Sequence, residues 1–64
     1  MRKVLAVFST ENDERKAELI EEGDTMWINF YENGNMIAAE TYEGHSRRFY
    51  EDAAENFVLG IKNV

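Results

Sequence analysis

The stretch TMWINFYENGNMIAAETY, residues 25–42, decides the fold of this 64-residue chain. It contains two strand-like runs joined at Asn33-Gly34. Asn-Gly between apolar runs is a strong signal for a β-hairpin, because both central residues of a type I′ turn need a positive φ. The turn also fixes the register of the two strands, and the register decides which side chains share a face of the sheet.

This register predicts two different faces for the hairpin. One face reads as core, with the pairs Glu32–Asn35, Phe30–Ile37, Ile28–Ala39 and Met26–Thr41. The other face mixes aromatic and polar side chains, in the pairs Tyr31–Met36, Trp27–Glu40 and Thr25–Tyr42. The mixed face is the feature of the sequence that bears most on function.

A second two-residue turn, at Gly23-Asp24, adds a third strand in the same register. It predicts the core pairs Leu19–Ile28 and Ala17–Phe30, and the mixed-face pairs Ile20–Trp27, Glu18–Asn29 and Lys16–Tyr31. Residues 14–22 also favour a helix by propensity. The agreement of two independent turns favours the strand.

The two ends of the chain supply one more strand and a helix. Residues 3–8 are rich in Val, Leu and Phe, which is typical of a strand with apolar contacts on both sides. Ser46 is a good N-cap, and residues 47–59 have a helical period that Gly60 should end as a left-handed C′ residue. The expected apolar stripe contains Phe49, Ala53 and Phe57, widened by Tyr50, Ala54 and Ile61.

These elements predict a single domain over residues 1–64, of the α+β class. Its four-stranded antiparallel sheet is a meander, and one C-terminal helix packs on one face. We expect the helix to cover Ala17, Leu19, Met26, Ile28, Phe30, Ile37 and Ala39. The uncovered face then holds the candidate residues for binding a partner or a second copy: Ile20, Trp27, Tyr31, Met36 and Tyr42, with Leu5 and Val7 if the first strand has that phase. A bare patch of this kind exceeds what monomers normally expose, so we expect a homodimer or a tightly held protein partner. The alternative is an ordinary solvated face.

The charge and composition narrow the function classes. The net charge of −6 disfavours a nonspecific nucleic-acid binder. It permits a basic partner or the mimicry of nucleic acid, and the simpler interpretation is that it serves solubility alone. The chain has no cysteine. Its first apolar run is too short for a signal peptide or a membrane span, so we expect a cytoplasmic protein without membrane contact.

One local cluster of cationic and polar side chains could bind an anion at the helix N-terminus: His45, Ser46, Arg47 and Arg48. The simpler interpretation pairs Arg47 with Glu51 and Arg48 with Asp52, one helical turn on. His45 is the sole histidine, and no motif pairs a nucleophile with a base. The carboxylates lack the spacing of a metal site. We therefore predict no enzyme activity, no catalytic residue, no cofactor, no metal and no small-molecule substrate.

The aromatic side chains permit a different function. Trp27, Tyr31 and Tyr42 on an open sheet could stack single-stranded bases. The order of four strands and a helix resembles, at the level of the fold, Whirly-type single-stranded DNA-binding domains. The resemblance implies binding through a basic sheet surface. Here Lys16 is the main cation expected on the aromatic face. Nucleic acid is therefore the less favoured partner.

Two longer segments, VFSTENDERKAE at residues 7–18 and YEDAAENFVLGI at residues 50–61, carry a family resemblance. With FYENG at residues 30–34 and GHS at residues 44–46, they resemble small uncharacterised proteins of marine tailed phages, in particular cyanophages. The resemblance implies a phage accessory protein that acts in the host cytoplasm by binding a host or phage protein. It implies no activity and no functional residue.

Overall fold

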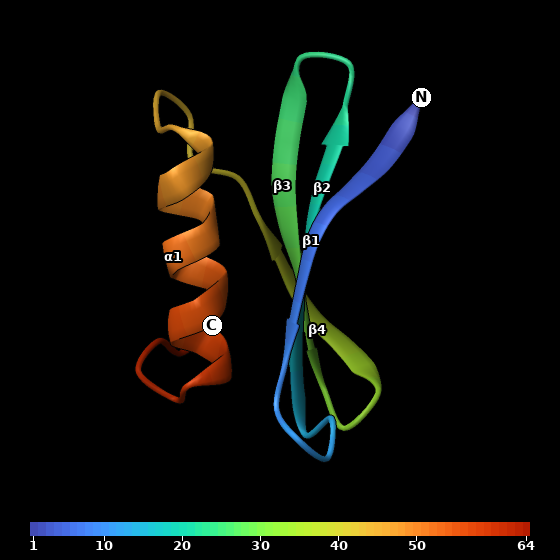
Figure 1. Ribbon diagram of the computed structural model, residues 1–64, viewed down its shortest axis with the longest axis vertical. Coiled ribbons are helices and arrows are strands. Elements are labelled where there is room, and N and C mark those ends of the chain that lie inside the picture. Colours follow the sequence, from blue (N-terminus) through green and yellow to red (C-terminus); the bar gives the residue numbers. More distant parts are fainter.

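A computed structural model describes residues 1–64 as one sheet and one helix. The elements are β1 (Arg2–Ser9), β2 (Arg15–Glu22), β3 (Thr25–Glu32), β4 (Asn35–Glu40) and α1 (Arg47–Val58). The strands form an antiparallel meander in the order β1-β2-β3-β4, and α1 packs on one side of it (Figure 1). The predicted fold class is confirmed. We call the sheet face toward α1 the inner face, and the opposite one the outer face.

The register of β2 and β3 is the one that the two turns predict. Leu19 pairs with Ile28 and Ala17 with Phe30, and the three predicted outer-face pairs also form. Residues 15–22 are therefore strand, despite their helical propensity. Asn33 and Gly34 both have positive φ, 53° and 84°, as the expected hairpin turn requires.

The register of β3 and β4 departs from the prediction at a β-bulge. The first two pairs, Glu32–Asn35 and Tyr31–Met36, form as predicted. Phe30 then pairs with Ala38 and Ile28 with Glu40, so Ile37 is the extra residue. The predicted partners beyond Tyr31 are therefore wrong, because one inserted residue exchanges the faces of all that follow. Ile37 and Ala39 are exposed instead of lying in the core.

A second bulge interrupts β1 at Leu5. Val4 pairs with Ile20, whereas Ala6 pairs with Leu19, and Leu5 packs against the core. The bulge turns Leu5 and Ala6 to the inner face and leaves Val4 and Val7 on the outer face. The conditional placement of Leu5 on the outer face is therefore wrong, and that of Val7 is confirmed.

The core lies between the inner face and α1, which contacts β1, β2 and β3 but does not reach β4. It consists of Ala17, Leu19, Ile28, Phe30, Tyr50, Ala54 and Phe57. The rings of Phe30 and Phe57 meet edge to face, with centroids 4.8 Å apart. The buried residues of the helix are thus Tyr50, Ala54 and Phe57, all within the expected stripe, but the stripe is centred on Tyr50 and Ala54 and not on Phe49 and Ala53. Phe49 is 42% exposed and lies at the border of the stripe.

The helix begins and ends as its sequence indicates. Ser46 is the N-cap residue, although its side chain makes no capping hydrogen bond. Gly60 has φ 84°, and the N–H groups of Gly60 and Ile61 donate to Phe57 and Asn56 in a Schellman motif. Because the chain turns there, Ile61 points into solvent, 71% exposed, and the expectation that it widens the stripe is wrong.

Candidate interaction surface

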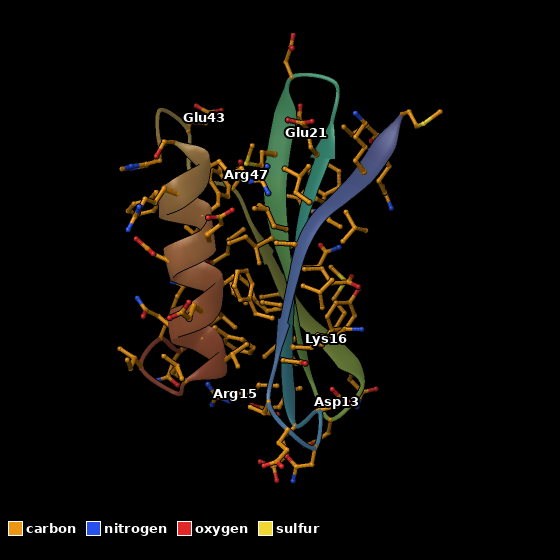
Figure 2. All side chains as sticks on the ribbon, in the orientation of Figure 1. Asp13, Arg15, Lys16, Glu21, Glu43 and Arg47 are labelled. Carbon is orange, nitrogen blue, oxygen red and sulfur yellow. The ribbon has the colours of Figure 1, made fainter.

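The outer face is built from alternate side chains of the four strands. Arg15 and Lys16, neighbours in β2, point to opposite sides, with Lys16 on the side away from the helix (Figure 2). Three rows of cross-strand neighbours follow from the register: Val4–Ile20–Trp27, Val7–Glu18–Asn29–Ala39 and Ser9–Lys16–Tyr31–Met36. The apolar and aromatic members form what we call the outer patch: Val4, Val7, Ile20, Trp27, Tyr31, Met36 and Ala39.

Most side chains of the outer patch are exposed or partly exposed to solvent, and one is buried. Val4, Val7 and Met36 are 55%, 53% and 53% exposed. Trp27 and Tyr31 are partly buried. Ile20 lies between Val4 and Trp27 in the register, and its side chain is only 3% exposed. Of the predicted contact residues, Ile20 therefore supports the patch from beneath and presents little surface to a partner.

Charged side chains lie over the aromatic rings of this face. The Arg2 guanidinium is 5.4 Å from the centre of the Trp27 ring, and the Lys16 ammonium is 4.9 Å from that of Tyr31. Lys16 also pairs with Glu18 at 3.6 Å. Burial raises the pKa of Tyr31, and the carboxylate of Glu18 raises it further. Tyr31 is thus a neutral hydrogen-bonding group at ordinary pH.

Tyr42 belongs to the other side of the molecule. The chain leaves the sheet after Glu40, and the Tyr42 ring packs on Phe49 and Tyr50, with centroids 5.3 and 5.2 Å apart. The Tyr42 hydroxyl donates a hydrogen bond to the Glu40 carboxylate, which also pairs with Lys62 at 3.4 Å. The prediction of Tyr42 as an outer-face residue is wrong, because it required the β4 register to continue without the bulge.

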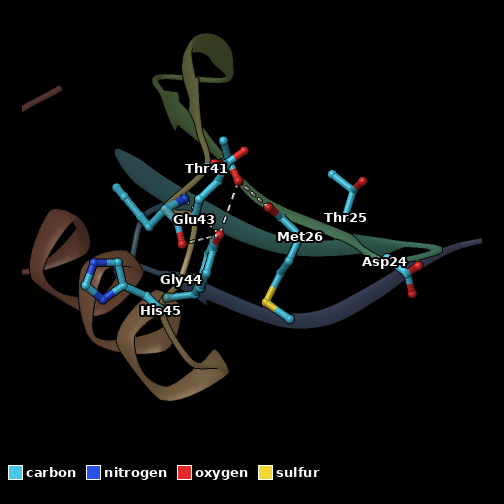
Figure 3. A pocket seen from close by; sticks show the side chains of 9 residues that line it. Asp24, Thr25, Met26, Thr41, Glu43, Gly44 and His45 are labelled. Carbon is cyan, nitrogen blue, oxygen red and sulfur yellow. Dashed lines mark hydrogen bonds between the residues drawn. The ribbon is translucent and has the colours of Figure 1, made fainter.

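A polar hollow of about 320 Å³ lies between the start of β3, the 41–45 loop and the first turn of α1 (Figure 3). The Tyr50 hydroxyl lies at its wall, where it accepts from the Tyr42 N–H at 2.8 Å and donates to the Tyr42 carbonyl at 3.0 Å. Thr41 donates to the Met26 carbonyl at 2.8 Å. His45 and Asp24 lie at opposite ends of the view. These hydrogen bonds connect the loop to the strand and to the helix, so the residues around the hollow have a structural role.

The predicted anion site does not gather its residues around one point. The Arg47 Nε lies 2.9 Å from Glu51, and its Nη2 donates to the Leu5 carbonyl at 3.4 Å. Arg48 forms no ion pair, so the expected Arg48–Asp52 bridge is absent. His45 stacks on the Phe49 ring with centroids 3.9 Å apart. The simpler interpretation is correct for Arg47.

Sequence reasoning missed Val4, Ala39 and Arg2 as members or neighbours of the outer patch. Arg2 could have been found only from the register of β1, which the bulge at Leu5 hides. No group of three or more His, Cys, Asp or Glu side chains is arranged to hold a metal ion. The helix falls short of the length and apolar character needed to cross a membrane.

Comparisons with known proteins found no match. No family model matches the chain, and neither a curated protein nor a solved structure matches it.

Proposed function

We propose that this chain is a non-catalytic interaction domain that forms a homodimer through its outer patch. The observation that carries the proposal is the sheet face itself. It holds seven apolar or aromatic side chains in adjacent strands, and the helix lies on the opposite side. Burying a fully exposed apolar side chain stabilises by about 1.5–3 kcal/mol before ordering costs, so the half-exposed Val4, Val7 and Met36 each contribute part of that and Ile20 contributes little.

The small core supports association. Only eight of the 64 residues are buried, and one of these, Ile20, faces the outer side. Domains of this size bury a low fraction of their surface and often depend on cross-links, metals or oligomerisation. The chain has no cysteine for a disulfide. A second copy over the outer face would add a second apolar layer to the domain.

The edges of the sheet are poorer places for association. A bulge interrupts β1 at Leu5 and another interrupts β4 at Ile37, so both outermost strands depart from regular geometry. Natural sheets use edge bulges in this way to block pairing with another strand. The face is therefore favoured over the edges.

The size of the face sets the expected strength. Strands of eight residues, at the usual spacings, give a face of roughly 500 Å² per copy, or about 1,000 Å² in total. That total is at the lower limit for a specific interface, so we expect dissociation at about micromolar concentration.

Two surface substitutions test the proposal. Met36→Lys places a charge in the outer patch on an edge strand, at a side chain 53% exposed. We expect it to weaken the dimer by at least about tenfold, because a charge is buried without a partner. Ile61→Lys is the matched control, since Ile61 is 71% exposed and lies beyond the helix. Light scattering over a concentration series measures both; equal masses for the two variants would reject the patch as the interface.

The resemblance to phage proteins adds the proposal that the chain is a phage accessory protein acting in a host cytoplasm. In that case a host or phage protein could take the place of the second copy on the outer patch. The acidity of the chain, net charge −6, permits a basic partner or the mimicry of nucleic acid.

A second candidate function is single-stranded nucleic-acid binding on the same face. The observation in its favour is that Trp27 and Tyr31 each lie beside a cation, the arrangement that stacking platforms use. Tyr42 no longer belongs to this platform. Titration with an oligonucleotide at low salt distinguishes the two functions, because stacking would quench the fluorescence of Trp27, the sole tryptophan.

A further inference from the structure

The centre of the outer patch is polar, and this restricts how two copies can face each other. Glu18 and Asn29 are cross-strand neighbours in the middle row, with Val7 and Ala39 at the two ends of that row. The rows above and below carry Trp27 and Tyr31. Any face-to-face dimer of identical chains buries two copies of Glu18 near its centre.

Two arrangements keep the strands of both sheets aligned, as sheet-on-sheet packing prefers. In the first, the twofold axis runs across the strands, along the middle row. Each side chain of that row then faces its own copy, so Glu18 meets Glu18. In the second, the axis runs parallel to the strands, between β2 and β3. Then β2 faces β3 of the other copy, and β1 faces β4.

The second arrangement gives complementary neighbours along the middle row and at Lys16. Glu18 faces Asn29, whose amide can donate to the carboxylate across the sheet spacing of about 10 Å. Lys16 faces Tyr31, and Val7 faces Ala39 at both ends of the row. The first arrangement instead places the two Glu18 carboxylates directly opposite each other in a desolvated centre, which is costly, whereas the second offsets them by one strand spacing of about 4.8 Å.

We infer that the partner of the outer patch is a second copy related by a twofold axis parallel to the strands, between β2 and β3, with Glu18 opposite Asn29. The inference rests on the proposed function and adds its geometry. Like any twofold interface it is isologous, and the register predicts which residues of the two copies face each other.

A charge-pair exchange at the ends of the middle row tests the axis. Val7→Lys introduces one charge and Ala39→Glu the opposite one, and both positions are exposed. They lie in the two outermost strands, roughly 14 Å apart within one chain, so attraction inside a copy is weak. The central pair is less suitable, because Glu18 and Asn29 are also neighbours within a copy.

Sedimentation equilibrium at about 0.1 M salt, where the screening length is about 10 Å, measures the dissociation constants. We expect Val7→Lys to weaken the dimer at least about tenfold, because each copy loses a buried valine. The double variant Val7→Lys/Ala39→Glu should dimerise about two- to thirtyfold more tightly than Val7→Lys, because two ion pairs form between copies. Val7→Lys/Asn63→Glu has the same net charge, with the acid in the C-terminal tail, and should give no rescue.

The outcomes separate the two claims. If the unmodified chain dimerises but the double variant binds more weakly than either single variant, the axis runs across the strands and the inference is wrong, while the proposed function stands. If Val7→Lys has no effect, Val7 lies outside the interface and the inference is wrong as well. If the unmodified chain stays monomeric at all concentrations, the proposed function fails, and the inference with it.

Discussion

At the scale of single residues, the hydroxyl groups of Tyr42 and Tyr50 position the loop that follows β4. Tyr50 lies in the core, and its hydroxyl bonds both the N–H and the carbonyl of Tyr42. Tyr42 in turn donates to Glu40, a residue that the β4 bulge turns to the inner face. Sequence reasoning placed Tyr42 on the outer face, because nothing in the local sequence reveals where the chain leaves the sheet.

The Tyr42–Glu40 bond predicts an alkaline loss of stability. Burial raises the pKa of Tyr42, and the Glu40 carboxylate that accepts a hydrogen bond from its hydroxyl raises it further. The folded state therefore holds this proton more tightly than the unfolded state, whose tyrosine pKa is about 10. The stabilisation is complete below that pH and is lost as the pH rises above it.

The comparison of the chain with its Tyr42→Phe variant measures this loss. Between about pH 9 and pH 12 the melting temperature of the unmodified chain should fall more steeply than that of Tyr42→Phe. Tyr31 titrates in both proteins, so its contribution cancels in the comparison. Parallel curves would show that the Tyr42 proton is not linked to folding.

At the scale of elements, the turns were predictable and the bulges were not. Gly23-Asp24 fixed the pairing of β2 with β3, and that register is correct along its length, whereas Asn33-Gly34 fixed the pairing of β3 with β4 only as far as the bulge at Ile37. In β4 the alternating positions Ile37 and Ala39 were expected on the inner face. Because Ala38 and Ala39 occupy alternate positions with the same side chain, packing gives little preference for either face. The bulge instead places Ala38 inside and lets Glu40 reach Tyr42 and Lys62.

Arg15 of β2 fixes the end of α1 to the sheet. Its Nη1 donates to the carbonyls of Phe57 and Lys62, at 3.0 and 3.5 Å, and its guanidinium lies 4.9 Å from the centre of the Phe57 ring. A cation at this position satisfies C-terminal carbonyls and complements the helix dipole. Sequence reasoning did not predict this contact, because it joins residues 42 and 47 positions apart.

Arg15→Met should lower the free energy of unfolding by about 1–2 kcal/mol, because the apolar stem remains while the charged hydrogen bonds are lost. Urea denaturation of dilute protein measures the change. Arg48→Met is the control for removing a cation, since Arg48 forms no ion pair and should change stability by less than about 0.5 kcal/mol. A loss at Arg15 no larger than that at Arg48 would show that the hydrogen bonds of Arg15 to the end of α1 do not stabilise the fold.

At the scale of the whole molecule, a single helix can cover only one of the two faces of the sheet. The core lies on the inner face of β1, β2 and β3, and no element of the chain covers the outer patch. The existence of this second face followed from the period-two pattern of β2 and β3. Its members on β1 and β4 did not, because the two bulges decide whether Val4, Val7 and Ala39 point outward.

The most direct test of the account is the mass of the unmodified chain in solution, from sedimentation equilibrium across the micromolar range at low and high salt. The account predicts a monomer–dimer equilibrium that persists at high salt, because burial of the outer patch is mainly apolar and is little screened. A mass of one chain, 7.5 kDa, at every concentration and both salt levels would contradict it.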